Sequence, residues 1–108
     1  MRCIVEIKSV SHEKIYQAQA VNLRPYLGLY EACAGLDIRM ELRNDGFYAV
    51  ERNGGVWQET KLRLEGFEYS EHRTIAKFSH GYEFDFCPGS DFPHALRVPG
   101  YDLPFKRR

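Results

Sequence analysis

The tripeptide Asn53-Gly54-Gly55 constrains the fold more than any other feature, because it separates two runs in which apolar and polar residues alternate. The preceding run covers residues 47–52 and the following run covers residues 56–65. Asparagine and glycine tolerate the positive φ angles of tight hairpin turns, whose twist matches that of the flanking strands. The sequence therefore predicts a β-hairpin in the middle of the chain.

The alternating pattern extends beyond this hairpin in both directions. Residues 38–43 alternate before it, and residues 73–78 and 82–86 form a last pair of predicted strands after it. In each of these strands one face is apolar and the other is mainly polar, which is typical of an antiparallel sheet with one face on the core. We therefore predict an antiparallel sheet over residues 38–86.

The residues before this sheet predict a strand and then a helical region. Residues 2–10 alternate and indicate a strand. For residues 12–35 we expect helix, since Pro25 suits a first helical turn and Gly35 suits the end of a helix. The apolar residues of the second half share one helical face: Leu23, Leu27, Tyr30 and Ala34. Residues 12–21 also show a period of two, so a strand is the alternative to a helix in this segment.

The last segment, residues 87–108, combines aromatic residues with repeated prolines. It is too apolar for a free tail, and we expect it to wrap over the sheet as irregular or edge-strand structure. The predicted fold is α+β, in one globular domain spanning residues 1–108. An N-terminal helical segment packs on a mostly antiparallel sheet of five to six strands, and the Pro-rich C-terminal segment is irregular.

Composition narrows the classes of function. The chain has 15 basic and 15 acidic side chains, which argues against direct binding of nucleic acid, where phosphate neutralisation supplies much of the affinity. No apolar run approaches the ~20 residues that span a membrane, and the N-terminus does not resemble a signal peptide. The three cysteines are an odd number with wide spacing. We expect a cytoplasmic protein without membrane association.

One constellation suggests an enzyme. Asp45 at a turn, followed by Glu59 and Lys61 on one strand, resembles the active-site pattern of restriction-endonuclease-like nucleases. The resemblance implies a divalent ion held by the carboxylates, with the lysine beside it. The chain departs from that family because no proline precedes Asp45 and no helix is predicted between or after the strands. A metal-dependent nuclease using these residues is thus one alternative.

A second alternative is binding of single-stranded nucleic acid. Bases could stack on aromatic residues of the sheet: Tyr48, Trp57, Tyr69 and Tyr82. Against this, single-strand binders also need a positive groove, whereas the sheet segment has a small acidic excess. The histidines and cysteines lack the close spacing of metal ligands, and no phosphate-binding loop is present, so we expect no catalytic residue, metal or cofactor.

The function predicted from the sequence is a small non-catalytic protein-binding module. Small motif-poor proteins are common among phage and mobile-element inhibitors of host machinery, including anti-CRISPR proteins, which is an analogy of class only. The expected partner is another protein, alone or in a nucleoprotein complex. A homodimer is a further alternative. Interfaces favour aromatic residues and arginine. The candidates are Arg52, Trp57 and Arg63 at the hairpin, and Phe92, Tyr101, Phe105, Lys106, Arg107 and Arg108 in the C-terminal segment.

Overall fold

The computed structural model describes residues 23–108, which form a nine-stranded antiparallel sheet. The strands are β1 (Gly28–Cys33), β2 (Leu36–Arg43), β3 (Gly46–Asn53), β4 (Val56–Leu62), β5 (Leu64–Tyr69), β6 (Thr74–Phe78), β7 (Glu83–Phe86), β8 (Ala95–Arg97) and β9 (Phe105–Arg107). Their order in space is β4-β3-β2-β1-β9-β8-β7-β6-β5. Two short 3₁₀ helices accompany them: η1 (Arg24–Tyr26) and η2 (Ser79–Gly81).

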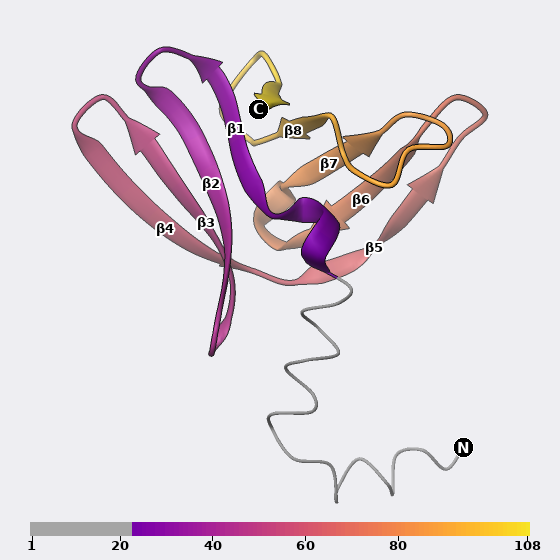
Figure 1. Cartoon of the computed structure of the whole chain (residues 1–108), viewed down its shortest axis with the longest axis horizontal. Helices are drawn as coiled ribbons and strands as arrows, with labels where there is room; N and C mark the ends of the chain where they lie inside the picture. The colour runs from indigo at the N-terminus through magenta and orange to yellow at the C-terminus, as the bar shows by residue number, and fades with distance from the viewer. Residues whose placement is uncertain (1–22) are drawn as a thin grey trace, which may run out of the picture.

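The sheet curls into an open half-barrel. β4 and β5 are its two edge strands, yet only Arg63 separates them in the sequence. Opposite edges of one sheet can be adjacent in the chain only if the sheet bends round on itself. Figure 1 shows two walls that diverge upward from the β4–β5 connection, one containing β1 to β4 and the other β5 to β8.

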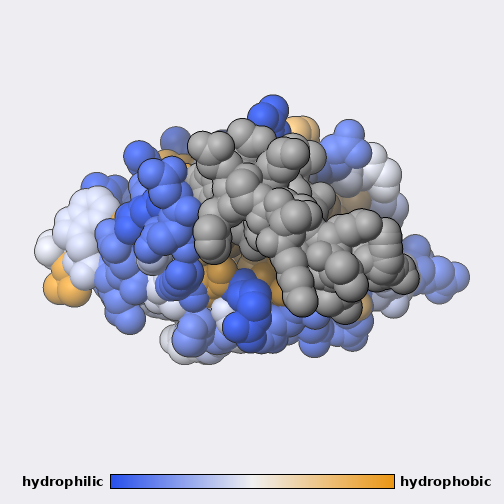
Figure 2. Space-filling model, turned by 90° about the horizontal axis from the view of Figure 1, so that it is seen from below, coloured by the Kyte–Doolittle hydropathy of each residue, from blue (hydrophilic) through white to orange (hydrophobic). Residues whose placement is uncertain are grey.

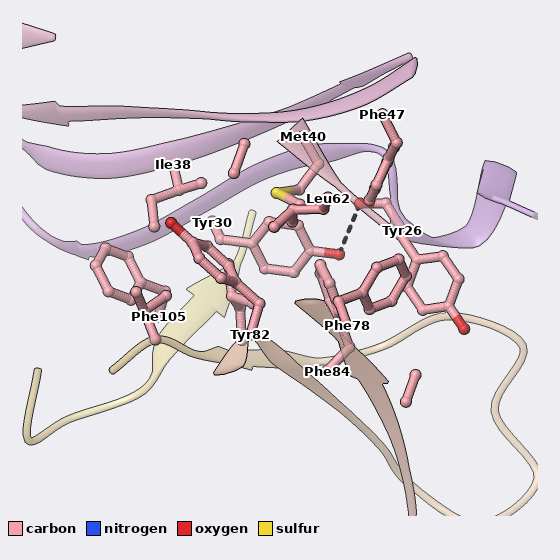
Figure 3. Packing of buried hydrophobic residues seen from close by; sticks show 14 residues of the cluster. Tyr26, Tyr30, Ile38, Met40, Phe47, Leu62, Phe78, Tyr82, Phe84 and Phe105 are labelled. Carbon is pink, nitrogen blue, oxygen red and sulfur yellow. Dashed lines mark hydrogen bonds between the residues drawn. The ribbon is translucent and has the colours of Figure 1, made fainter. Parts of the chain in front are cut away.

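Buried aromatic side chains fill the space between the two walls (Figure 3). Tyr30 and Ile38 from one wall and Phe84 from the other are fully buried. Tyr26 of η1 adds a ring whose centroid lies 5.0 Å from that of Phe78 and 4.9 Å from that of Phe84. The Tyr30 hydroxyl donates a hydrogen bond to the Tyr26 carbonyl oxygen at 3.1 Å. The core therefore joins both walls and η1.

The central hairpin is present. Asn53 lies opposite Val56, and β3 and β4 pair in unbroken register from there to Phe47 and Leu62. Gly54 has a φ of +64°, whereas Gly55 has no left-handed φ. A positive φ at the first central residue alone is the pattern of a type II′ turn.

The helix predicted across residues 28–33 is wrong, since these residues form β1. Gly28 has a φ of +130°, which an α-helix cannot contain. Tyr30 lies opposite Ile38 of β2 and Arg107 of β9, so β1 gains main-chain partners on both sides. The predicted helical turn at Pro25 is reduced to η1. The strand predicted over residues 2–10 and the region 12–22 lie outside the described residues.

The C-terminal segment also differs from its prediction. It supplies β8 and β9, which lie in the middle of the sheet between β7 and β1 rather than over its face or at its edge. Each is only three residues long, because prolines and turns interrupt the segment. The predicted α+β class is therefore wrong: residues 23–108 are a nearly all-β, nine-stranded half-barrel rather than a helix packed on five or six strands.

Candidate functional site

The tip of the β3–β4 hairpin exposes two large apolar side chains. Trp57 is 64% exposed and Val56 is 69% exposed. Trp57 lies directly opposite Arg52 on β3, and Arg52 lies opposite Asp37 on β2. Because directly opposite residues share one face of a sheet, these three side chains form a row across the outer face. We call Arg52, Val56 and Trp57 the hairpin-tip surface.

The side chain of Arg52 is held in place by a buried carboxylate on the neighbouring strand. Its Nη2 donates to Oδ2 of Asp37, whose side chain is buried. The guanidinium carbon lies 5.9 Å from the centre of the Trp57 ring, within the range of a cation–π contact. The row therefore links a buried carboxylate, a half-exposed guanidinium and an exposed indole, which restricts the positions that Arg52 can take beside Trp57.

Glu59, one of the residues of the nuclease alternative, is bound to an arginine. Its two carboxylate oxygens accept hydrogen bonds from Nη1 and Nη2 of Arg43, each at 3.0 Å. These bonds lower the pKa of Glu59. Arg43 also donates to Glu41 at 3.1 Å and lies over the Tyr48 ring at 4.4 Å. Glu59 is thus part of a surface network of ion pairs on the outer face.

Asp45 and Lys61 line one open cleft, whose wall does not include Glu59. Asp45 accepts a hydrogen bond of 2.7 Å from the Tyr48 hydroxyl, and this bond lowers the pKa of Asp45. Within residues 23–108, no group of three or more histidine, cysteine, aspartate or glutamate side chains is arranged to hold a metal ion. Among the described residues, Asp45 and Glu59 therefore belong to no such group.

The aromatic residues of the single-strand alternative lie on different faces. Tyr48 and Trp57 are on the outer face of the β2–β4 wall, and Tyr48 is partly covered by Arg43. Tyr82 is buried. Tyr69 is 73% exposed and its ring stacks on Phe67 at 6.0 Å, on the distant strand β5. The fold does not bring these rings onto one continuous platform.

The C-terminal candidates are likewise dispersed. Phe105 is fully buried, while Phe92 and Lys106 are exposed. Tyr101 donates a hydrogen bond to Glu51. The basic end is engaged with β1, since Arg108 pairs with Glu31 and Arg107 binds main-chain carbonyls near η1. At the hairpin, Arg63 is exposed and pairs with Glu65 at 3.1 Å.

Asp37 was missed by sequence reasoning, although a signal for it exists. The turn at residues 44–45 fixes the register of β2 on β3, and counting back from it places Asp37 opposite Arg52. Nothing in the sequence around Asp37 indicates that its carboxylate is buried. Only the register of β2 on β3 identifies Arg52 as its partner. Val56 was missed because it lies on the other face of β4 from Trp57 and becomes exposed only at the tip.

Comparison of the chain with protein-family models, with curated proteins and with solved structures gave no match.

No helix among residues 23–108 is both long and apolar enough to cross a membrane. Outside the grey residues, the face seen in Figure 2 is mainly hydrophilic, with hydrophobic areas only in small patches. The candidate site therefore depends on the geometry of the hairpin-tip surface alone.

Proposed function

We propose that the chain is a non-catalytic protein-binding module that uses the hairpin-tip surface to hold its partner. The observation that supports this most is the 64% exposure of Trp57 in a hairpin whose two strands pair without interruption, beside an arginine that is already anchored. Tryptophan and arginine are the residues most enriched among those that dominate binding energy at protein interfaces.

Preorganisation adds to this argument. Arg52 is restricted by Asp37 before any partner arrives, so less side-chain entropy is lost on binding. Trp57 lies in a strand that pairs with β3 in one register, without bulges. A partner on the outer face would meet an indole and a guanidinium in a nearly fixed geometry, and Val56 exposes an apolar side chain on the other face of the same tip.

The neutral net charge supports a protein partner over a polyanion, because no excess of cations is available to neutralise phosphates. We place the module in the cytoplasm as part of the same proposal. Cys33 and Cys87 are free and exposed, and reducing compartments keep such thiols unpaired.

The proposal is tested by capturing proteins from the native host on immobilised wild-type chain and two variants. Trp57→Ala removes the proposed anchor, while Tyr69→Ala removes a similarly exposed ring on the opposite wall. We expect wild type and Tyr69→Ala to recover the same stoichiometric partner and Trp57→Ala to lose it. Recovery of that partner by all three chains in equal amounts would contradict the proposal.

A further inference from the structure

Among residues 23–108, no strand pairs with the outer edges of β4 and β5, because these two strands end the sheet. An unpaired edge presents a row of free main-chain N–H and C=O groups, which is a template for adding another strand. The two edges differ in how strongly they oppose such an addition, and this difference identifies the edge that is available.

β5 carries a feature that blocks strand addition. Its register on β6 shifts between Leu64 and Gly66, which marks a bulge or irregularity. Bulges twist an edge away from potential partners and are common where proteins protect their edges. β4 has no such interruption: all seven of its residues pair with β3 in one register, and it contains neither proline nor glycine. The regular, uninterrupted edge is therefore β4.

The hairpin determines which groups of β4 are free. A two-residue turn makes Asn53 and Val56 a hydrogen-bonded pair, and such pairs alternate along the ladder. The main-chain groups of Trp57, Glu59 and Lys61 consequently point away from β3. The next residue of this series confirms the direction, since the Arg63 N–H and C=O bind Ser79 on the far side, at 2.9 and 2.8 Å.

We propose that β4 pairs antiparallel with β4 of a second copy of this chain, about a twofold axis at Thr60. In this register Glu59 of each copy lies opposite Lys61 of the other copy, and the two threonines face each other at the axis. Glu59 and Lys61 then exchange main-chain hydrogen bonds across the interface with the groups that point away from β3.

The charges select this register over its neighbours. An axis at Glu59 would place two glutamates opposite each other, and an axis at Lys61 would do the same with two lysines. Like charges directly opposite each other destabilise a strand pair. An axis at Thr60 converts the same two residues into attractive pairs, one on each side of the axis. The sequence of β4 is thus complementary to itself, which an interface with twofold symmetry requires.

The length of the new ladder is limited by the β4–β5 connection. Because the Arg63 main chain already binds Ser79, pairing with the second copy cannot extend beyond Leu62. The added hydrogen bonds therefore centre on residues 59–61. Such a short ladder implies a dimer that dissociates on dilution, so its detection requires a range of protein concentrations.

Sedimentation equilibrium of the pure full-length chain, from micromolar to near-millimolar concentration, tests this pairing. We expect a monomer–dimer equilibrium in wild type. Glu59→Lys and Lys61→Glu each place like charges opposite each other twice, and each should weaken the dimer about tenfold or more. The double variant Glu59→Lys/Lys61→Glu restores opposite charges and should recover most of the affinity.

Glu68→Lys on β5 is the matched control. Glu68 is also an exposed edge-strand carboxylate, paired with Lys77 at 3.1 Å, and its replacement should leave the dimer unchanged. A monomeric wild type at every concentration would overturn the inference, as would single variants that dimerise as well as wild type. The readout requires no other protein, so it succeeds or fails independently of the proposed partner binding.

A second measurement covers the case in which the charge variants fold poorly. Under oxidising conditions Thr60→Cys should form a covalent dimer, since directly opposite residues of a non-hydrogen-bonded pair have Cα atoms about 4.5 Å apart. Gln58→Cys, on the same face of β4, lies opposite Leu62 of the second copy and should not crosslink above wild type. Equal crosslinking of the two variants would contradict the register.

Discussion

Arg52 donates a hydrogen bond to the buried carboxylate of Asp37 on the neighbouring strand. This contact joins β2 to β3 on the outer face of the wall, beside the exposed ring of Trp57. Asp37→Ala should therefore lower the free energy of unfolding by about 1–3 kcal/mol, because it removes the acceptor of a partly buried guanidinium. Urea denaturation measures this. Arg39→Ala, at an exposed position of the same strand, should change stability by less than about 0.5 kcal/mol.

The conformation of the central turn predicts that alanine substitutions at Gly54 and Gly55 differ in their effect on stability. Gly54 has a φ of +64° and Gly55 does not have a left-handed φ, while a Cβ at either position would meet open space. Gly54→Ala should destabilise the chain by about 1–2 kcal/mol through backbone strain alone. Gly55→Ala should cost clearly less. Thermal unfolding of both variants gives the comparison, and equal losses would show that the turn has another conformation.

This hairpin was predictable from the sequence because its cause is local. Asn53-Gly54-Gly55 supplies the turn, and the alternation on both sides supplies two faces with different polarity. The same reasoning placed Trp57 and Arg52 together, since the register of a two-residue hairpin follows from the turn. Their exposure, and the anchoring of Arg52 by Asp37, required the neighbouring strand as well.

The failure at residues 28–33 has a non-local cause. Tyr30 fits a helical apolar stripe in the sequence, but β1 pairs with β2 on one side and with the distant β9 on the other. Main-chain pairing with a strand that lies more than 70 residues later cannot be read from a local pattern. For the same reason the C-terminal segment was expected outside the sheet, although Phe105 is buried in its middle.

Arg107 connects β9 to the residues around η1, where the described part of the chain begins. Its guanidinium donates to the carbonyl oxygens of Pro25 and Leu27, at 2.9 and 3.1 Å, and to the Tyr30 hydroxyl at 2.9 Å. Arg107→Ala should lower the free energy of unfolding by about 2–3 kcal/mol, since several acceptors lose a charged donor. The adjacent exposed Lys106→Ala should have little effect. Similar losses for the two variants in guanidinium denaturation would contradict this role.

Burial of two tyrosines predicts instability in alkali. Removal from water raises the pKa of Tyr26 and of Tyr30 to about 12, from 10.0. The unfolded chain loses these protons from about pH 10, whereas the folded chain keeps them, so unfolding releases protons. The free energy of unfolding should be unaffected by these groups below pH 10 and should fall between about pH 10 and 12.

Denaturation at a series of alkaline pH values, together with phenolate absorbance, measures this effect. Tyr30→Phe removes one of the two groups and should make the decline with pH less steep than in wild type. An unchanged slope in this variant, with all tyrosines of the folded chain ionising near their ordinary pKa, would rule out burial as the cause.

The proposed function depends on Trp57 as the anchor of a protein interface. The most direct measurement is the equilibrium affinity of the purified partner, once captured, for wild type, Trp57→Ala and Tyr69→Ala. We predict that Trp57→Ala weakens binding by about 30-fold or more, the range of an interface residue worth at least about 2 kcal/mol, and that Tyr69→Ala binds like wild type. Equal affinities for wild type and Trp57→Ala would contradict the account.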